Sequence, residues 1–410
     1  MKVTILTTYY KLGGASIAAT RLFYALNMTK TETILRVGYD KEKEFSNVVS
    51  SFSFIERIFN KIKYDFYHFM EKLFSYNDEF HSPNFLPTTI LKKINADDID
   101  VLNIHWVNAG LISLEQISRI NKPVVLTMHD LWPICADEHY VDDFGRSPYS
   151  TLNSKVNLSP YKKFLLNRKV KAFKNVKHIV VPSKWVMSQV INSKVLSGIS
   201  TTVIPNVLHE EFFKKKNREE LRYHEGLSNK KVIGFGAIGG AKDKRKGFDL
   251  LLASLSHVLC KDHKCSVIIF GQDAPEVLPI ELEGFDVLYT GNVDSVVKMS
   301  EYYHMMDVMI VPSRLETFGQ TASEAIATGT PVVAFNTSGL RDVISHNETG
   351  YLARCFDVQD LANGIQHYLN LSDNDISSVR RKCSEFAYEN WRPEKISNSY
   401  NAVYQKVISS

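Results

Sequence analysis

Two glutamates stand eight residues apart in the stretch SRLETFGQTASEA, residues 313–325. They are Glu316 and Glu324, and the residues between them are typical of the start of a helix. The preceding run DVMIVPS is typical of the end of a buried strand. One carboxylate is therefore expected in a strand-to-helix loop, and the other one or two turns into the helix. Because ionised carboxylates are strong hydrogen-bond acceptors, both suit hydroxyl groups better than phosphate.

The predicted helix start between the glutamates suits a phosphate group. If a helix begins near Gly319, the backbone N–H groups of Phe318, Gly319 and Gln320 point at its N-terminal end, which attracts anions. A glycine there lets the backbone approach a ligand closely. We interpret Glu316 as a contact for a sugar hydroxyl beside the phosphate, and Glu324 as an acceptor for a ribose diol. The alternative is an ordinary helix with one favourable N-terminal acid and one surface acid.

A glycine-rich turn upstream carries several cations. The segment GFGAIGGAKDKRKGFDLL follows a predicted strand and precedes a predicted helix, and its end is crowded by Lys242, Lys244, Arg245 and Lys246. A diphosphate held between this turn and the helix at Gly319 would be neutralised from both sides. A basic turn alone is a weak signal, but this turn lies in the same predicted domain as the two glutamates.

The elements that position these residues alternate between strands and helices. Short β-branched runs occupy residues 2–9, 33–39, 100–106, 123–130 and 177–183, and the cycle restarts with runs at 230–238, 265–271, 285–291, 307–313 and 330–336. Amphipathic helical patterns lie between them. This alternation predicts parallel sheets that are covered on both faces. We therefore expect an α/β chain of two doubly wound, Rossmann-like domains, with ligands at the strand ends in a central cleft between them.

The domain boundaries follow from this pattern and from the length of 410 residues, which is too great for one ordinary core. We predict a first domain over residues 1–206, a second over 207–385, and a C-terminal helix over 386–410 that packs back on the first domain. A proline followed by a charged run predicts a linker near residues 206–230. In the last segment one helical face is expected to carry Trp391, Ile396, Tyr400, Val403 and Tyr404.

The charge is unevenly distributed. The net charge is +4, but residues 144–209 contain eleven Lys and Arg and no Asp or Glu. Within this stretch we predict a helix with Ser159 as its N-cap and Pro160 at its first position. Its buried stripe is expected to contain Phe164, Leu165, Ala172 and Phe173, and its other faces Lys162, Lys163, Arg168, Lys169, Lys171 and Lys174. The stretch is either a solvated basic face or a surface for a phospholipid leaflet, a lipid-linked phosphate or nucleic acid.

Residues 54–74 depart from the alternation, because they form one long, aromatic and basic-amphipathic segment. This segment is either an ordinary packed helix or a lid or membrane-facing helix inserted in the first domain. No run of eighteen uncharged apolar residues predicts a transmembrane helix. The N-terminus is interpreted as a buried strand rather than a signal peptide. The five cysteines are scattered without a CxxC motif, so reduced thiols in a cytoplasmic protein are expected.

Taken in order, these motifs resemble one enzyme family over nearly the whole chain. The spacing of Glu316 and Glu324 resembles the E-x7-E signature of retaining glycosyltransferases of the GT-B fold, and is most similar to family four, which uses nucleotide sugars. RKGFDLL resembles the K-G element of that family, and YHMMDVMIVPS resembles the strand before the signature. GGAS resembles the glycine loop of the first domain, and IPN resembles the junction between the domains. NIHWVNAG, PVVLTMHDLWPICADEHY and VVPSKWV resemble a branch that builds bacterial surface polysaccharides, including colanic-acid-type enzymes.

The resemblance implies roles for individual residues. It places Glu316 at the donor sugar, and it places His129 by the reacting centre on the acceptor side. His105, before Trp106, is expected to be a packed strand-end histidine rather than an acceptor contact. The implied donor contacts include Lys246 at the diphosphate, Glu324 at the ribose and Val293 near the base, and the full set is Gly13, Gly14, Arg245, Lys246, Gly291, Val293, Phe318, Gly319, Gln320 and Glu324.

The chain departs from the family pattern in two places. The family usually has a Gly-Arg pair after the first strand of the second domain, and this chain has Gly236 and Ala237. Arg245 or Lys242 would then supply the second phosphate contact. Relatives with the HD-W stretch often continue with cysteines spaced for a metal, whereas this chain keeps only Cys135. We therefore expect no structural zinc.

Two acidic groups could suggest a metal site. Asp98 and Asp100 form a DxD, which is the metal motif of the other large glycosyltransferase fold, but here the motif precedes a strand instead of following one. Asp137, Glu138 and His139 are adjacent, and one turn does not supply a closed tetrahedral site. We expect no metal and no cofactor, with the nucleotide sugar as donor substrate.

These observations predict a retaining, metal-independent hexosyltransferase. It would move a hexose from a nucleotide-diphosphate sugar to a hydroxyl of a growing, lipid-linked bacterial surface glycan, as in lipopolysaccharide or O-antigen synthesis. Cations and helix-end amides would stabilise the leaving diphosphate. The alternatives are a nucleotide-sugar epimerase or hydrolase on the same fold, and a non-catalytic nucleotide-sugar-binding subunit. The expected partners are the donor, the glycan acceptor and the anionic inner face of the plasma membrane, with no nucleic acid. The expected location is cytoplasmic or peripheral on that membrane.

Overall fold

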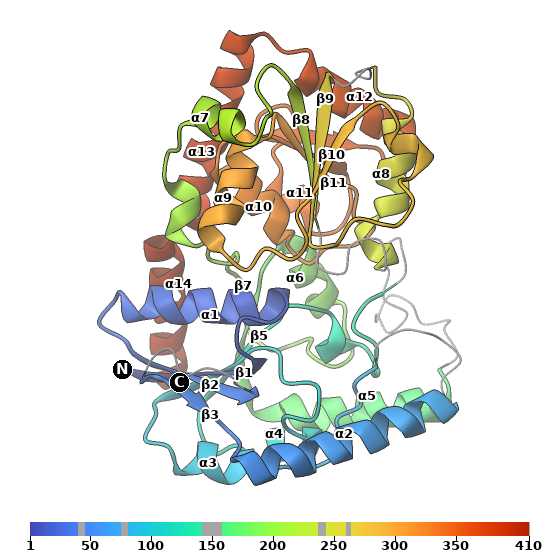
Figure 1. Ribbon diagram of the computed structural model, residues 1–410. Helices are drawn as coiled ribbons and strands as arrows, with labels where there is room; N and C mark the ends of the chain where they lie inside the picture. Colours follow the sequence, from blue (N-terminus) through green and yellow to red (C-terminus); the bar gives the residue numbers. More distant parts are fainter. Residues whose placement is uncertain (40–45, 75–80, 142–157, 237–242, 260–263, 410) are drawn as a thin grey trace. The chain divides into compact units, whose positions relative to one another are not determined.

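The computed structural model describes residues 1–39, 46–74, 81–141, 158–236, 243–259 and 264–409 (Figure 1). The chain forms two compact units. The first unit comprises Met1–Val207 together with Glu394–Ser410, and the second comprises Leu208–Pro393. We had placed the first division between residues 206 and 207, and the return to the first domain at residue 386. Each unit has its own parallel sheet and its own hydrophobic core.

The first unit is built on a parallel sheet. Its strands are β1 (Lys2–Tyr9), β2 (Glu32–Tyr39), β3 (Val48–Ser50), β4 (Val101–Ile104), β5 (Val124–Thr127), β6 (Val176–Val181) and β7 (Thr201–Val203). Within the described residues their order is β3-β2-β1-β4-β5-β6-β7. Ile5 of β1 pairs with Leu35 of β2 on one side and with Asn103 of β4 on the other. The chain therefore winds one way from β1 and the other way from β4, which is the doubly wound order.

Helices connect these strands and cover the sheet. They are α1 (Gly14–Asn27), α2 (Phe54–Phe74), α3 (Ile90–Ala96), α4 (Leu114–Ile117), η1 (Trp132–Ile134), α5 (Pro160–Ala172), η2 (Phe173–Asn175), α6 (Lys184–Ile191) and α14 (Pro393–Ile408). Leu22 and Phe23 of α1 share a core with Ile5 of β1 and with Tyr400 and Tyr404 of α14. Helices α1 and α14 therefore cover the same face of the sheet (Figure 1).

The second unit repeats the same plan. Its strands are β8 (Lys231–Gly236), β9 (Cys265–Phe270), β10 (Asp286–Tyr289), β11 (Val308–Val311), β12 (Val332–Phe335) and β13 (Gly350–Ala353). In the described residues they lie in the order β10-β9-β8-β11-β12-β13, with every pairing parallel. The direction of winding changes between β8 and β11. The predicted fold class, two doubly wound parallel α/β domains, is confirmed.

Helices lie on both faces of the second sheet. They are η3 (Glu210–Phe213), α7 (Arg218–His224), η5 (Lys244–Lys246), α8 (Phe248–Leu255), η6 (Ile280–Leu282), α9 (Val296–Met305), α10 (Gln320–Ala327), α11 (Leu340–Val343), α12 (Val358–Leu369) and α13 (Asp373–Trp391). Along β11, Met309 points into the core that contains α9 and α10, and Ile310 into the core that contains α8 and α12. Burial on both faces explains why these strands are continuous apolar runs.

Several local predictions are wrong. The strands β3, β7 and β13 were not predicted, because these short strands at the sheet edges have the sequences VVS, TTV and GYLA, which are not continuous apolar runs. The proposed linker near 206–230 is instead part of the second unit, where Leu208 and Phe212 are fully buried beside η3. Cys265 is in a disulfide, which contradicts the expectation of reduced thiols at that position.

The C-terminal segment is two helices instead of one continuous apolar face. Arg392 is extended between α13 and α14, since a residue before proline disfavours the helical conformation. Trp391 packs edge-on against Phe318 in the second unit. Tyr404 packs in the first unit, where its hydroxyl accepts a hydrogen bond of 2.7 Å from the Asn103 amide. Placing Trp391 on the face of α14 was therefore wrong.

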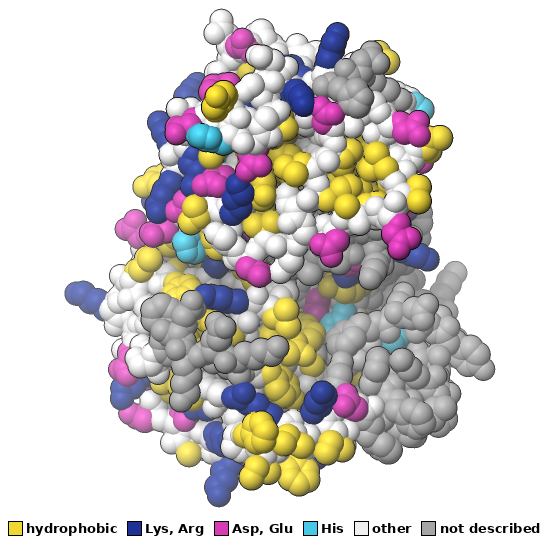
Figure 2. Space-filling model, viewed as in Figure 1, with side chains coloured by type: hydrophobic (Ala, Val, Ile, Leu, Met, Phe, Trp, Pro, Cys, Tyr) yellow, Lys and Arg dark blue, Asp and Glu magenta, His cyan; other side chains and the backbone are white. Residues whose placement is uncertain are grey.

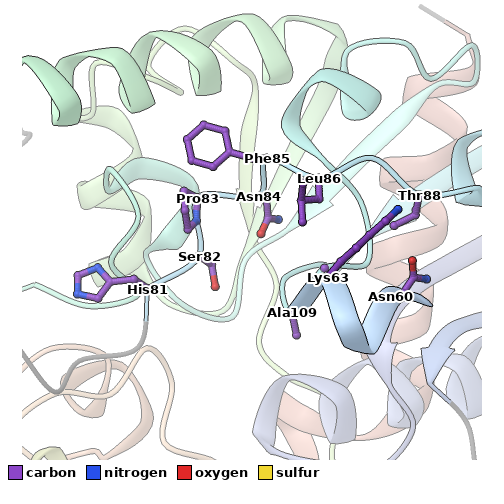
Figure 3. Close-up of a pocket in the computed structure, with 11 residues that line it drawn as sticks. Asn60, Lys63, His81, Ser82, Pro83, Asn84, Phe85, Leu86, Thr88 and Ala109 are labelled. Atoms are coloured by element: carbon purple, nitrogen blue, oxygen red, sulfur yellow. The ribbon is translucent and has the colours of Figure 1, made fainter. Parts of the chain in front are cut away.

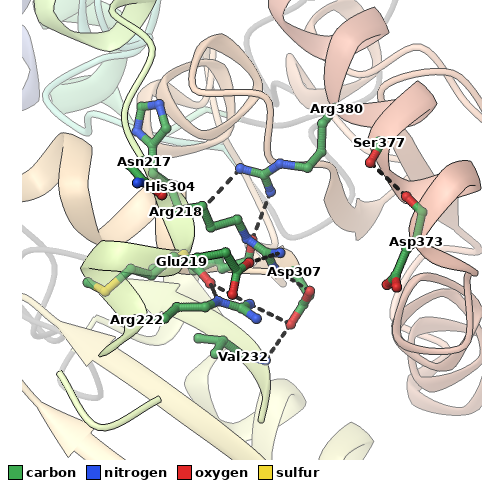
Figure 4. A network of polar contacts seen from close by, with 12 residues as sticks. Asn217, Arg218, Glu219, Arg222, Val232, His304, Asp307, Asp373, Ser377 and Arg380 are labelled. Carbon is green, nitrogen blue, oxygen red and sulfur yellow. Dashed lines mark hydrogen bonds and ion pairs between the residues drawn. The ribbon is translucent and has the colours of Figure 1, made fainter. Parts of the chain in front are cut away.

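A buried ion-pair cluster supports the start of β11 (Figure 4). Asp307 accepts hydrogen bonds from Arg222 Nη2 at 2.8 Å and from the Val232 N–H at 2.7 Å, and it also pairs with Arg218. Burial by itself would raise the pKa of Asp307, but the Arg222 and Arg218 charges hold that pKa below its usual value. Arg380 of α13 donates to the Met306 carbonyl at 2.9 Å. The cluster thus connects α7 and α13 to strand β8 and to the residue before strand β11.

Removing the carboxylate from this cluster should destabilise the second unit. In Asp307→Ala the buried Arg222 and the partly buried Arg218 lose their counter-charge, so we expect the free energy of unfolding to fall by about 3–5 kcal/mol. Glu385→Ala is the matched control, because Glu385 pairs with Arg381 on the exposed side of α13 and such pairs are worth at most about 1 kcal/mol. Chemical denaturation measures both values. Similar losses in the two variants would contradict the assignment.

Candidate functional site

The loop after β11 and the basic turn after β8 meet at one ion pair. Lys246 of η5 donates from Nζ to Glu316 Oε1 at 2.6 Å, although the two residues are seventy positions apart. The Ser313 hydroxyl donates to the same oxygen at 3.0 Å. The structure therefore brings together the cation that we predicted for a diphosphate and the carboxylate that we predicted for a sugar. They lie in the segments that follow the adjacent strands β8 and β11, at the switch point where doubly wound sheets bind ligands.

The position of Lys246 depends on the residue that follows it. Gly247 has a φ of +69°, and a Cβ there would lie 2.0 Å from the Pro312 carbonyl oxygen. No other residue type fits without moving the turn away from the end of β11. Arg314 adds two bonds between the segments, because its N–H donates to the Arg245 carbonyl and its Nη1 to the Lys244 carbonyl, both at 2.7 Å. Arg314 was not among the predicted site residues.

The position of Glu316 depends on the loop after β12, and no residue of this loop was among the predicted site residues. The Glu316 N–H donates to the Ser338 hydroxyl at 2.9 Å, and its carbonyl accepts from the Gly339 N–H at 2.8 Å. A Cβ at Gly339 would lie 2.3 Å from the Thr317 carbonyl oxygen. The Asn-Thr-Ser-Gly sequence directly after β12, residues 336–339, was the available signal.

The helix predicted to begin near Gly319 does so. Gly319 is the N-cap of α10 with a φ of +93°, and α10 starts at Gln320. A Cβ on Gly319 would meet the Leu340 side chain at 2.7 Å. The Phe318 side chain is buried in the core against Trp391, so only its backbone is suited to the predicted phosphate contact.

Glu324 is buried, which rules out the alternative that it is a surface acid. Its residue exposure is 7%, and its Oε2 accepts a hydrogen bond of 2.9 Å from the Tyr303 hydroxyl. A buried carboxylate needs hydrogen-bond donors, and Tyr303 supplies one of them. Tyr303 was missed because its sequence context, an aromatic pair in a helix, looks like ordinary core.

The remaining predicted donor contacts have structural partners. The Arg245 guanidinium pairs twice with Asp243, through Nε at 3.1 Å and Nη2 at 2.6 Å. The Gly291 carbonyl accepts from the Gly271 N–H at 2.8 Å, which links the ends of β9 and β10. Val293 is half-buried and packs on the core. Lys242, the other candidate for the second phosphate contact, lies outside the described residues.

In the first unit, His129 follows β5 and forms a pair with His105, which follows β4. His129 Nε2 and His105 Nδ1 share a hydrogen bond of 2.8 Å. Burial lowers the pKa of His129 to about 4, and burial together with the neighbouring His129 lowers the pKa of His105 well below its usual value. Both rings are therefore neutral at pH 7. His105 is packed at a strand end, as predicted, but it also contacts the predicted site residue.

A second polar network holds the loop after His129. Asp130 accepts from Trp106 Nε1 at 2.9 Å and from His139 Nδ1 at 2.5 Å, and it caps the Trp132 N–H at 3.0 Å. His139 Nε2 shares a further hydrogen bond of 2.9 Å with the Ser82 hydroxyl. None of these partners of Asp130 was identified from the sequence. At the end of β1, Gly13 is the N-cap of α1 with a φ of 79°, and Gly14 begins that helix.

The acidic groups considered for metal binding have other partners. Asp98 and Asp100 both contact Lys2, at the start of β1 and β4 instead of at their carboxyl ends. His139 bonds to Asp130, Glu138 to Lys162 and Asp137 to His81. Within the part of the chain that the structure describes, no group of three His, Cys, Asp or Glu residues is arranged to hold a metal ion.

A small cavity lies under α2 in the first unit (Figure 3). It is lined by Asn60 and Lys63 of α2, by residues between His81 and Thr88, and by Ala109 and Gly110. Its volume is about 40 Å³, which suits one or two water molecules. Ligand pockets usually measure roughly 300–1,000 Å³, so this cavity is not a sugar site.

Substitution of Gly247 should damage the turn that presents Lys246. In Gly247→Ala the new methyl group adds a backbone clash with Pro312 to the strain of a positive φ, so we expect a loss of about 3 kcal/mol or more in unfolding free energy. Gly226→Ala is the matched control, because Gly226 has a φ of +67° but nothing within 4 Å of the added Cβ. It should lose only about 1 kcal/mol. Equal losses on denaturation would show that the contact with Pro312 does not constrain the turn.

Two protein-family models match the chain. The model described as Glycosyltransferase Family 4 matches residues 64–212. The model described as Glycosyl transferases group 1 matches residues 218–390, which contain the Lys246–Glu316 pair. The two matches follow one another along the chain, and the gap between them is short.

Curated relatives match about half of the chain. It is 29% identical over 207 residues to the N-acetyl-alpha-D-glucosaminyl L-malate synthase of Bacillus anthracis, with 50% of this chain and 53% of that protein covered. It is 26% identical over 200 residues to the capsular polysaccharide biosynthesis glycosyltransferase CapM of Staphylococcus aureus, with 47% and 52% covered. The chain thus spans about half the length of these relatives.

Solved structures resemble the chain over its full length. The sucrose-phosphate synthase of Thermosynechococcus elongatus has a TM-score of 0.69 at 17% identity, with 100% of this chain and 99% of that chain covered. Anabaena HepE in complex with UDP and glucose has a TM-score of 0.68 at 17% identity, with 99% and 100% covered. At this identity the similarity concerns the fold.

Proposed function

Because the chain belongs to the GT-B glycosyltransferases, with a family 4 and a group 1 domain, we propose that it transfers a hexose from a nucleotide-diphosphate sugar to a hydroxyl group. The contact between Lys246 and Glu316 carries this proposal. It places a cation suited to a diphosphate beside a carboxylate suited to a sugar hydroxyl, at the switch point of the second sheet. Glu324 and the start of α10 would hold the ribose and a phosphate.

The ion pair also explains how a carboxylate can stand beside a diphosphate site. An unpaired Glu316 would repel the donor, whereas Lys246 neutralises it at 2.6 Å. A lysine ammonium has three N–H donors, so Lys246 can keep its bond to Glu316 while donating to a phosphate oxygen. As the sugar–phosphate bond breaks, negative charge grows on the diphosphate, and a preorganised cation stabilises it.

We propose that transfer retains the anomeric configuration by same-face displacement. A covalent nucleophile would need a carboxylate presented to the sugar carbon. Glu316 is held by Lys246 and Ser313, and Glu324 is buried against Tyr303. In the first unit, the neutral His105–His129 pair suits hydrogen bonding to an uncharged acceptor hydroxyl better than binding to phosphate.

The proposed acceptor is a growing, lipid-linked bacterial surface glycan, such as a lipopolysaccharide or O-antigen unit, at the anionic inner face of the plasma membrane. Two relatives support this, namely CapM and the lipopolysaccharide 1,2-N-acetylglucosaminetransferase of Salmonella typhimurium, which is 23% identical over 236 residues. The names of other relatives specify small acceptors, L-malate and D-inositol 3-phosphate. Acceptor assays should therefore include both kinds of molecule.

The first experiment is a panel of UDP-, GDP- and dTDP-sugars, screened by thermal shift and then by turnover. Formation of a glycosylated acceptor supports the proposal. Release of free sugar, or conversion to an epimer, without transfer would favour the hydrolase or epimerase alternative. Binding without any turnover would favour a non-catalytic subunit.

Glu316→Ala should abolish most turnover while leaving nucleotide affinity nearly unchanged, because Glu316 is proposed to contact the sugar. The loss of one stabilising contact of this kind costs about 100- to 1000-fold in rate. Lys246→Ala should weaken both turnover and nucleotide affinity. Transfer by Glu316→Ala at the wild-type rate would show that the central assignment is wrong.

A double variant tests whether the two side chains act as a pair. Lys246→Ala leaves an unneutralised carboxylate at the diphosphate, so Lys246→Ala/Glu316→Gln should recover part of the lost nucleotide affinity. Lys230→Ala is the control, since Lys230, just before β8, pairs with Asp286, the first residue of β10, at the opposite end of these strands from the site. Strictly additive effects on affinity would contradict the pairing.

Turnover should survive exhaustive chelation, because we propose that Lys246, other cations of the turn and the α10 N-terminus stabilise the diphosphate without a metal or cofactor. The acids of the DxD motif are held by Lys2. The assay is turnover before and after EDTA, followed by addition of manganese. Inactivation by EDTA with rescue by manganese would contradict metal independence.

A further inference from the structure

Helix α2 turns an apolar face outward. Its side chains Phe54, Ile55, Ile58, Phe59 and Ile62 are 46% to 77% exposed. At about 100° per residue, these five positions cover one side of the helix over an arc of roughly 140°. Single exposed apolar residues are ordinary, but a contiguous row of five large ones marks an interaction surface.

The opposite side of α2 is fixed to the first unit. Glu56 accepts hydrogen bonds from the Ser53 N–H at 2.7 Å and Lys93 Nζ at 2.9 Å, and it also accepts one from Thr89. Arg57 Nη2 donates to the Ser50 hydroxyl at 2.7 Å. These bonds stop the helix from rolling over to bury its apolar face.

Lysines border this apolar face. On a helical projection, Lys61 and Lys63 lie at the two edges of the exposed row, and both are exposed. Nearby carboxylates are engaged with cations: Glu56 with Lys93, Glu115 with Arg168, and Glu138 with Lys162. Among the α2 residues whose side chains are described, Asp65 is the one exposed acid, and on the same projection it falls within the apolar arc, about one turn beyond Ile62. Figure 2 shows apolar side chains beside Lys and Arg along the lower edge, where Figure 1 draws α2.

Helix α5 is separated from α2 by the segment 81–88 and adds further lysines to the surface of the first unit. Phe85 lies between them, because its ring stacks on Phe164 of α5 at 6.4 Å, and it lines the cavity under α2. The exposed residues of α5 and its continuation include Tyr161, Lys163, Phe164, Lys171 and Lys174. The predicted N-cap Ser159 and first-turn Pro160 of this helix are confirmed.

The structure nevertheless reduces the basic surface that the sequence predicts for α5. Phe164 is exposed, contrary to the prediction that it is buried. Arg168 is buried and pairs with Glu115, and Lys169 is fully buried, where its Nζ donates to the Trp132 carbonyl and, at 2.8 Å, to the Cys135 carbonyl. Burial lowers the pKa of Lys169 to about 7. Two of the six predicted surface cations therefore face inward.

We infer that α2 lies flat in an anionic lipid surface, with Phe54, Ile55, Ile58, Phe59 and Ile62 among the acyl chains and the lysines of α2 and α5 at the phosphate level. This is the geometry of an interfacial amphipathic helix. The inference deepens the membrane attachment proposed above by assigning it to one surface. No described helix has both the length and the apolar character needed to cross a bilayer. A second copy of the chain is a poorer occupant, since it would bring a second set of lysines against the first.

The test is co-sedimentation of the full chain with vesicles of phosphatidylcholine alone, and of phosphatidylcholine with one quarter phosphatidylglycerol. We expect Ile55→Ser/Phe59→Ser/Ile62→Ser to lose at least about tenfold in binding to the anionic vesicles. The matched control is Tyr223→Ser/Val277→Ser/Ile280→Ser in the second unit, where the three side chains are 73% to 82% exposed. It should bind like the wild type, and both variants should unfold at the wild-type denaturant concentration.

The charge contribution needs a separate variant. Lys61→Gln/Lys163→Gln should weaken binding at low salt by about fivefold for each lysine, and the difference should shrink as salt screens it. Equal binding of the wild type to neutral and anionic vesicles, or unchanged binding of the α2 variant, would overturn the inference. So would a dimer that the α2 substitutions convert to monomer without any effect on vesicle binding.

These measurements are independent of the proposed reaction, because they use no nucleotide sugar. Turnover with a water-soluble acceptor, measured on the same variants, should be unaffected. Lost turnover in every protein, with vesicle binding as expected, would count against the proposed function and leave the assignment of α2 in place. Normal turnover without any vesicle binding would count against the assignment of α2 and leave the proposed function in place.

Discussion

The contact between Lys246 and Glu316 is the constraint on which the candidate site depends. Two oppositely charged groups from segments seventy residues apart meet only if both backbones approach closely. On one side, the absence of a side chain at Gly247 lets the basic turn lie against Pro312. On the other, the absence of a side chain at Gly339 lets the loop after β12 hold the backbone of Glu316. The two glycines are therefore part of the site. Gly247 allows the backbone contact that positions Lys246, and Gly339 allows the one that positions Glu316.

The two units use the same strand order but place different chemistry at their strand ends. In the second unit the segments after β8 and β11 carry a partly buried ion pair and a helix N-terminus, which suit a charged ligand. In the first unit the segments after β4 and β5 carry His105 and His129, which burial keeps neutral. A neutral imidazole can form a hydrogen bond with a hydroxyl group, and no ion pair has to be broken for this contact. The difference supports the proposal of an anionic donor on the second unit and an uncharged hydroxyl acceptor on the first.

The sequence predicts an element well where a hydrophobic pattern extends over many residues. It predicts poorly those features whose position depends on a few tertiary contacts. The ranges of β1 and α2 agree with their predicted ranges because eight and twenty-one patterned residues define them. The edge strand β13 was missed, because its sequence GYLA is only partly buried and forms no apolar run. The Lys246–Glu316 contact could be anticipated because both motifs follow adjacent strands of one sheet. The bonds from Ser338 and Gly339, the Asp130 network and the burial of Glu324 could not, since each depends on a tertiary neighbour that no local pattern specifies.

The basic stretch shows why a count of cations in the sequence overestimates a charged surface. A helix at a sheet edge must bury one side, and in α5 that side includes Arg168 and Lys169 as well as leucines. Their long apolar stems pack inside, and their polar ends donate to carbonyl groups that would otherwise be buried without donors, while Arg168 also pairs with the exposed Glu115. Cations used in this way do not attract a membrane. Apolar side chains on the outer face of α2 have no such internal use, because exposure to water costs free energy that burial would recover. Apolar exposure on α2 therefore supports the proposed membrane-facing surface better than cation density in α5 does.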